Sequence, residues 1–102
     1  MDLKPNDAMV AAFRKGLRLH EEGRSGEGLM SSTVSWARRA VNGESLSPEK
    51  VKQMNAWFAR HAVDKKQGWN TPGKETPGYV AHLLWGGDAG RAWSAAKVKQ
   101  LK

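Results

Sequence analysis

Four of the five tryptophans lie in the part of the sequence that also holds most of the net positive charge. Residues 47–66 and residues 67–102 each contain five basic and two acidic residues, so six of the seven net positive charges fall after Leu46. Trp57, Trp69, Trp85 and Trp93 lie in the same part. Aromatic rings interleaved with cations are typical of surfaces that stack bases and contact phosphates.

The alternative is that these large rings fill a small core. We favour this alternative for Trp85 and Trp93, which lie on predicted apolar helix faces, and we expect Trp36 and Trp69 to be the more exposed pair. Trp69 lies within a polar segment, where it either folds back as a plug on the core or meets a partner. Of these two, the plug is favoured.

Several cations and two tryptophans are candidate contacts to nucleic acid. The short connection from Gly43 to Leu46 predicts that the helices on either side of it pack as neighbours and join their cations in one patch. A helix-turn-helix is one interpretation of this arrangement, but a plain αα-hairpin is favoured, so we expect no sequence-specific binding. The candidates are Arg38, Arg39, Lys50, Lys52, Arg60, Lys65, Lys66, Trp69 and Trp36.

Residues for catalysis or metal binding are sparse. Among the three histidines only His61 has a helically spaced acid, Asp64, and two ligands do not define a metal site. The chain has no cysteine, no nucleophile triad, no phosphate-binding loop and no paired carboxylates. The glycines of residues 86–90 could hold an anion at a helix start, but a tight turn is favoured because Asp88 would occupy the same donors. We therefore expect no enzyme activity, no catalytic residue, no metal and no cofactor.

The elements that must position these residues are predicted to be helices, because apolar residues recur at spacings of three and four. The apolar stripes are Met9, Val10, Phe13, Leu17 and His20; Met30, Val34, Ala37 and Val41; Val51, Met54, Phe58 and Ala62; Tyr79, Val80, Leu83 and Leu84; and Ala89, Trp93 and Ala96. The residues expected to cap helix starts are Asn6, either Ser31 or Ser32, Ser47 (which precedes Pro48 and Glu49) and Asp88. The residues expected to end helices are Gly23, Gly43 and the pair Gly86-Gly87. Residues 23–28 and 64–78 show no period and are predicted loops.

Length and composition complete the prediction of fold and location. A chain of 102 residues with 39% hydrophobic residues is expected to form one domain, 1–102, with its ends at 1–4 and 97–102 frayed. The fold class is all-α: a small bundle of four or five short helices with a long basic loop between the third and fourth. No apolar run is long enough to cross a bilayer, and no signal peptide is visible at the N-terminus. We expect a soluble protein of the host cytoplasm, with association with a virion as the alternative, and no membrane partner.

Two sequence strings carry a resemblance to a known group of proteins. Phe58-Ala59-Arg60-His61 and Leu84-Trp85-Gly86-Gly87-Asp88-Ala89-Gly90, within a match over about residues 30–95, resemble a small helical module of tailed-phage and prophage proteins. This family is poorly characterised and accompanies phage head and DNA-handling proteins, so the resemblance implies a non-catalytic accessory role. The chain departs from the family pattern at His82, where an apolar aromatic residue is expected.

Together these observations predict a small basic phage-type accessory protein. Its lysines and arginines would bind nucleic acid, with DNA the expected partner and RNA left open, through backbone phosphates without strong sequence specificity, and Trp69 or Trp36 would add base stacking. The alternative is a protein-interaction module that takes part in phage head assembly or binds a host factor. That alternative predicts an exposed apolar patch around Trp36, Trp57 or Trp69.

Overall fold

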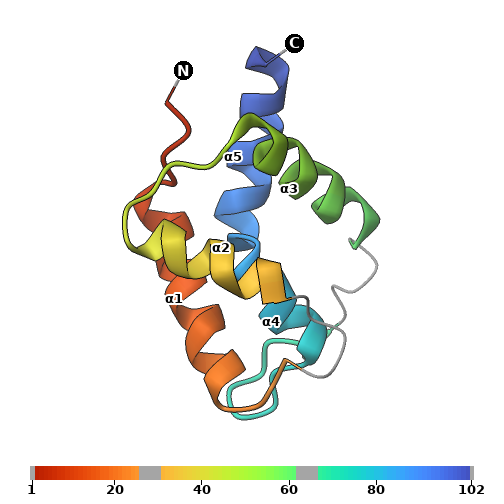
Figure 1. The fold of residues 1–102 in the computed structure, drawn as a ribbon. Coiled ribbons are helices and arrows are strands. Elements are labelled where there is room, and N and C mark those ends of the chain that lie inside the picture. Colours follow the sequence, from red (N-terminus) through yellow and green to blue (C-terminus); the bar gives the residue numbers. More distant parts are fainter. Residues whose placement is uncertain (1, 26–30, 62–66, 102) are drawn as a thin grey trace.

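The computed structural model describes residues 2–25, 31–61 and 67–101, and within these ranges it contains five α-helices and no strand. This confirms the predicted all-helical fold of four or five helices. The helices are α1 (Asp7–Glu21), α2 (Ser31–Val41), α3 (Pro48–Arg60), α4 (Pro77–Leu84) and α5 (Gly87–Gln100), and Figure 1 shows their arrangement. Residues 97–100, which were expected to fray, belong to α5.

Side-chain caps start three of the helices at the residues that local chemistry favours. The Asn6 side chain accepts a hydrogen bond from the Met9 amide at 2.9 Å and so begins α1. Ser47 does the same for α3, accepting from the Lys50 amide at 3.0 Å, with Pro48 in the first helical turn. Both caps were predicted. Thr76, which the sequence analysis did not single out, caps α4 by accepting from the Tyr79 amide at 3.2 Å.

The start of α5 differs from the prediction that Asp88 is its cap. The N-cap is Gly86, in the left-handed region with φ of 110°, and no side chain caps this helix. A Cβ on Gly86 would come within 2.9 Å of the Gly90 Cα, so the turn between α4 and α5 needs glycine for space as well as for backbone angle. Asp88 lies in the first turn instead, with a carboxylate oxygen 3.3 Å from the His82 Nε2.

The buried face of α5 is also rotated from the predicted one. Ala96 was expected to face inward but is exposed, and Trp93 is only half-buried. The buried residues are Gly87, Gly90 and Ser94, which recur at spacings of three and four. Small residues on this face let α5 approach its neighbours closely: a Cβ on Gly90 would lie 2.8 Å from the Trp85 carbonyl oxygen and 3.8 Å from the Phe58 ring.

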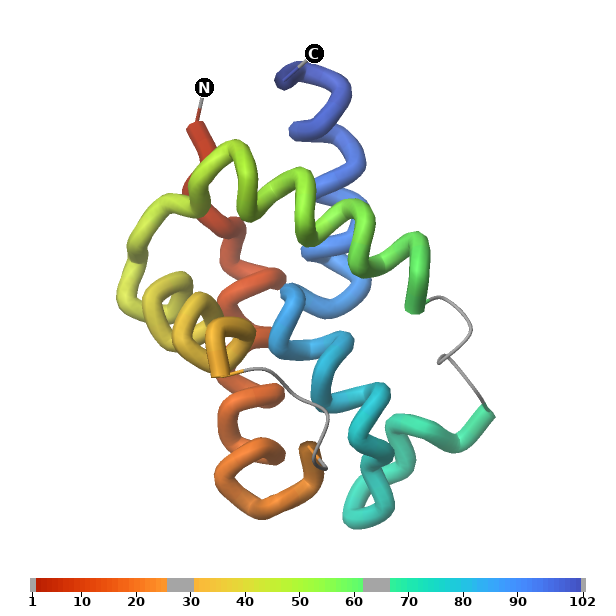
Figure 2. The backbone as a smooth tube through the Cα atoms, turned by 45° about the vertical axis from the view of Figure 1, so that its right-hand side comes forward, coloured from red at the N-terminus to blue at the C-terminus, as the bar shows by residue number. Residues whose placement is uncertain are grey.

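Helix α1 packs against α2, α4 and α5, helix α4 also packs on α5 and α2, and α3 packs on α5 (Figures 1 and 2). The most buried hydrophobic side chains come from several of these helices and form one core. Its central members are Met9, Phe13, Ala37, Val51, Met54, Val80 and Leu84.

The backbones of α2 and α3 do not approach as closely as the predicted hairpin requires. These two helices are not among the closely packed pairs, although only residues 42–47 separate them. The connection is held elsewhere, because the Leu46 amide donates to the Leu3 carbonyl at 3.0 Å and both leucines are buried. Large side chains, including Trp36 and Lys50, lie between the two helices and link them.

The connection from α3 to α4 is described from residue 67 onward, so Asp64, Lys65 and Lys66 lie outside the described residues. Its described part contains one base, Lys74, and one acid, Glu75. Arg24 ties this part to the end of α1, donating to the Gly73 carbonyl at 2.9 Å and lying 3.7 Å from a Glu75 carboxylate oxygen. The connection is therefore attached to the end of α1 at Gly73 and Glu75.

Candidate nucleic-acid interface

Trp69 lies on the core and is not offered to solvent. It is 8% exposed, with ring centroids 5.1 Å from Tyr79 and 5.0 Å from His82. The Thr76 amide donates to the Trp69 carbonyl at 3.0 Å, which fixes the loop at this position. The expectation of a plug is confirmed, and the expectation that Trp69 is more exposed than Trp85 and Trp93 is wrong, because both of those are half-buried.

Lys50 is also buried, contrary to the prediction that it contacts phosphate from the surface. Its residue is 7% exposed, and its Nζ lies 3.9 Å from the Trp85 ring centroid and 5.5 Å from that of Trp36. The two rings offer the ammonium group a favourable π face in place of water. The loss of hydration of the ammonium group outweighs this attraction to the rings and lowers the pKa of Lys50 to about 8.

The half-buried tryptophans near Lys50 continue into a stack of rings. Trp85 and Trp57 lie nearly parallel with centroids 5.5 Å apart, and Trp57 lies nearly parallel to His61 at 4.4 Å. At the other end, the Arg39 guanidinium lies 4.3 Å from the Trp36 centroid. We call the set Trp36, Lys50, Trp85, Trp57 and His61 the aromatic stack. It connects α2, the end of α4 and α3 through rings and cations of the chain itself.

The remaining predicted cations are exposed, but they do not share one environment. Arg39 is paired, with its Nε 3.3 Å from a Glu44 carboxylate oxygen, whereas Arg38, Lys52 and Arg60 have no acidic partner within the described ranges. Because the backbones of α2 and α3 are not closely packed, the exposed cations of the two helices are not joined as the predicted hairpin required. Lys65 and Lys66 are outside the described residues.

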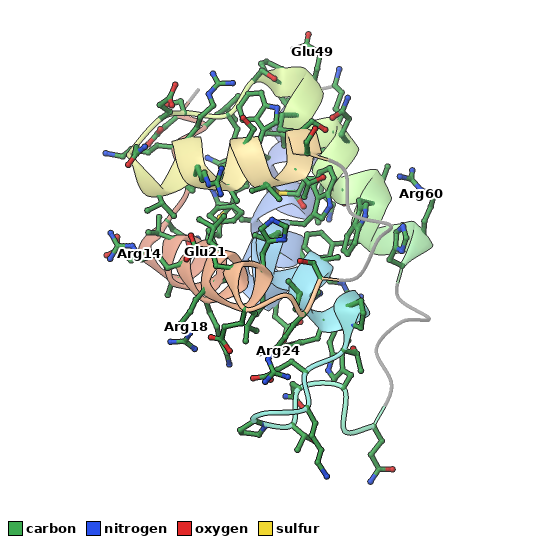
Figure 3. All side chains as sticks on the ribbon, turned by 60° about the horizontal axis from the view of Figure 1, so that its bottom comes forward. Arg14, Arg18, Glu21, Arg24, Glu49 and Arg60 are labelled. Atoms are coloured by element: carbon green, nitrogen blue, oxygen red, sulfur yellow. The ribbon has the colours of Figure 1, made fainter. Side chains whose placement is uncertain are left out.

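The net charge is concentrated on three of the five helices. Helices α2, α3 and α5 together contain eight basic and two acidic residues, whereas α4 contains neither kind and α1 contains three basic and two acidic residues. Figure 3 shows Arg14 and Arg18 of α1 projecting on the opposite side of the view from Arg60 of α3. The α1 cations are thus separate from those of α3, and Arg18 lies beside Glu22 at 3.9 Å.

The packed pair α3 and α5 presents the same pattern of exposed residues twice. Each helix has an acidic residue in its first turn. A cation follows three residues later, an alanine four residues after that, and a second cation after four more, and all four residues are exposed. Residues eight apart lie on the same side of a helix, about 12 Å from one another along its axis. The two patterns are Glu49, Lys52, Ala56 and Arg60 on α3, and Asp88, Arg91, Ala95 and Lys99 on α5.

We call Lys52–Ala56–Arg60 and Arg91–Ala95–Lys99 the basic stripes. Within the part of the chain that the structure describes, none of their four cations has an acidic partner, and the acid nearest to the second stripe, Asp88, lies beside His82. Alanines between the cations leave the backbone of the helix open to a large ligand. The sequence analysis did not select Arg91 or Lys99 as contacts, although the repeated four-residue spacing was visible in the printed sequence.

Groups for other chemistry are few in this structure. Within residues 2–25, 31–61 and 67–101, no three histidine, cysteine, aspartate or glutamate side chains gather as they would around a metal ion. The same residues include no helix of the length and apolarity that crossing a membrane requires. His82 and Asp88 form a pair at 3.3 Å, and His82 is buried with its ring edge toward Phe58.

No protein-family description matches the chain, and no similar curated protein or solved structure was found.

Proposed function

We propose that this protein binds nucleic acid through the phosphate backbone, using the two basic stripes of α3 and α5, without reading the base sequence. The observation that carries the proposal is the repeated pair of exposed cations on two packed helices, four side chains without acidic partners among the described residues. Phosphate contacts of this kind supply most of non-specific binding.

The lack of a base-reading element supports binding without sequence specificity. Base edges are read mainly by polar side chains at the start of a helix placed in a groove. The stripes offer exposed cations, which suit phosphate oxygens, separated by alanine, whose side chain has no polar atom with which to read a base. The phage or prophage setting that the sequence resemblance implies, and an accessory role beside DNA-handling proteins, belong to this proposal.

Paired substitutions test the location of the binding surface. Lys52→Ala with Arg60→Ala, and Arg91→Ala with Lys99→Ala, each remove two charges from one stripe. Each pair is expected to weaken binding of a random-sequence duplex on the order of 30-fold at 0.15 M salt, from the loss of two phosphate contacts. The matched control is Arg14→Ala with Arg18→Ala on α1, which removes the same charge from the other side and is expected to weaken binding much less. Equal losses in all three pairs would refute the proposed location.

A second candidate function is protein binding, and the observation that favours it is the aromatic stack. Its three tryptophans are half-buried and come together from α2, α3 and the end of α4. Tryptophan is enriched at protein interfaces because it combines a large apolar area with a polar edge. A specific protein that is retained after nuclease treatment, and lost in Trp36→Ala but not in the stripe variants, would favour this candidate.

A further inference from the structure

We infer that the nucleic acid bound by the basic stripes is a duplex and not a single strand. The inference rests on the proposed function, since it names the class of nucleic acid for that same surface. It starts from the location of every aromatic ring that a single-strand binder would need.

Proteins that bind single strands without sequence preference combine cations with aromatic faces on which successive bases stack. Here the rings of the aromatic stack already have partners within the chain. Trp36 has Arg39 and Lys50, Trp85 has Lys50 and Trp57, and Trp57 also has His61. A base that stacked on these half-buried rings would compete with contacts that they already make within the chain.

The other aromatic residues are withdrawn in different ways. Four of them are buried in the core, each 9% exposed or less: Phe13, Phe58, Trp69 and Tyr79. Trp93 is the half-buried exception, and its ring lies 5.8 Å from the Lys97 Nζ. It is two residues from both Arg91 and Ala95, about 200° around α5, and therefore faces away from the stripe on that helix.

Without stacking, the charge density of the ligand decides which form binds more tightly. A duplex carries one phosphate charge per about 1.7 Å of axis, and each neutralised phosphate contributes about −0.9 to the salt slope, against about −0.7 for a single strand. Four cations fixed on two helices therefore gain more from a duplex, with an expected slope of log K against log salt near −3.6.

Fluorescence anisotropy with a labelled 24-base-pair random duplex and a labelled 24-nucleotide oligo-dT tests this inference. We expect the full chain to bind the duplex severalfold more tightly, with the steeper salt slope and no quenching of tryptophan emission by the strand. Equal binding, or tighter binding of oligo-dT with quenching, would overturn the inference and leave phosphate binding in place. Failure to bind either ligand at low salt would overturn the proposed function, and the inference with it.

The stripe variants add a measurement that distinguishes failure of the duplex inference from failure of the proposed function. Lys52→Ala with Arg60→Ala is expected to weaken binding of the duplex more than binding of oligo-dT, because the duplex gains more from each phosphate contact. If the same pair affected only oligo-dT, the stripes would be a single-strand surface.

Discussion

The aromatic stack and the basic stripes both contain a lysine of α3, but they place its charge in opposite environments. In the stack, the Lys50 ammonium lies 3.9 Å from an indole ring and is withdrawn from water. In the stripes, the cations are exposed and separated by alanine. Lys50 and Lys52, two residues apart, therefore differ in exposure because they lie on different sides of α3, and only Lys52 is free of the core to take the binding role proposed above.

The largest expected effect comes from removing both stripes. Lys52→Ala, Arg60→Ala, Arg91→Ala and Lys99→Ala together are expected to weaken duplex binding on the order of 1,000-fold at 0.15 M salt. The unfolding free energy should change by less than about 0.5 kcal/mol per site, because these side chains are exposed and have no acidic partner among the described residues. Binding isotherms measure the loss of affinity, and urea unfolding measures the change in stability. A large stability loss would erase the contrast between stack and stripes.

The next effect concerns the stack. Trp85→Ala removes the ring that contacts both Lys50 and Trp57, and it is expected to lower the unfolding free energy by about 3 kcal/mol, near the lower end of the range for large buried aromatics because Trp85 is half-buried. Duplex affinity of the folded fraction should stay unchanged. Urea unfolding followed by anisotropy at low denaturant measures both. A selective loss of affinity with stability intact would place the stack in the binding surface.

The pH dependence of stability tests the burial of Lys50. The pKa is about 8 in the folded chain against 10.5 without burial, so between these values the unfolded state holds more protons and stability rises with pH. Lys50→Met keeps the apolar stem and removes the titration. From pH 7.5 to pH 10, we expect the unfolding free energy of the natural chain to increase by about 2 kcal/mol more than that of Lys50→Met. This value is reduced slightly for the attraction between the ammonium group and the rings. Parallel pH curves for the two proteins would show that Lys50 is hydrated.

The smallest effect is expected at the exposed end of the stack. Arg39→Ala removes a guanidinium that covers Trp36 and pairs with Glu44 at the surface, so it should cost under about 1 kcal/mol. Thermal unfolding of this variant beside Arg38→Ala, which has no such partners within the described residues, checks the difference. A larger loss in Arg38→Ala would contradict the contacts assigned to Arg39.

The sequence predicted most of the helices because their signals are local. Asn6 and Ser47 start α1 and α3 by accepting hydrogen bonds from amides three residues further along the chain. Gly43 and Gly86, both with positive φ, follow the ends of α2 and α4. The signal for α5 failed at Asp88 because a neighbouring histidine on α4 takes its carboxylate, and Gly86 adopts the left-handed angle that starts the helix. Such competition between tertiary and local partners leaves no local pattern.

The candidate site was predicted less well, for a related physical reason. Charge and residue type indicated a polyanion surface, but they could not show that Lys50 is enclosed by Trp36 and Trp85, residues 14 and 35 positions away. Nor could a short connection show that α2 and α3 are not closely packed, because that depends on the side chains between them. The four-residue spacing of the stripes was visible in the sequence, and their pairing required the packing of α3 on α5.

The most direct test of the central claim is a two-dimensional amide NMR titration of the chain with a short random duplex, with the five tryptophan indole signals observed in the same spectra. The account predicts the largest shift changes at exposed amides of α3 and α5 near the four stripe cations, with the indole signals of Trp36, Trp57 and Trp85 nearly constant. Changes centred on α1 or on those indole groups would contradict it.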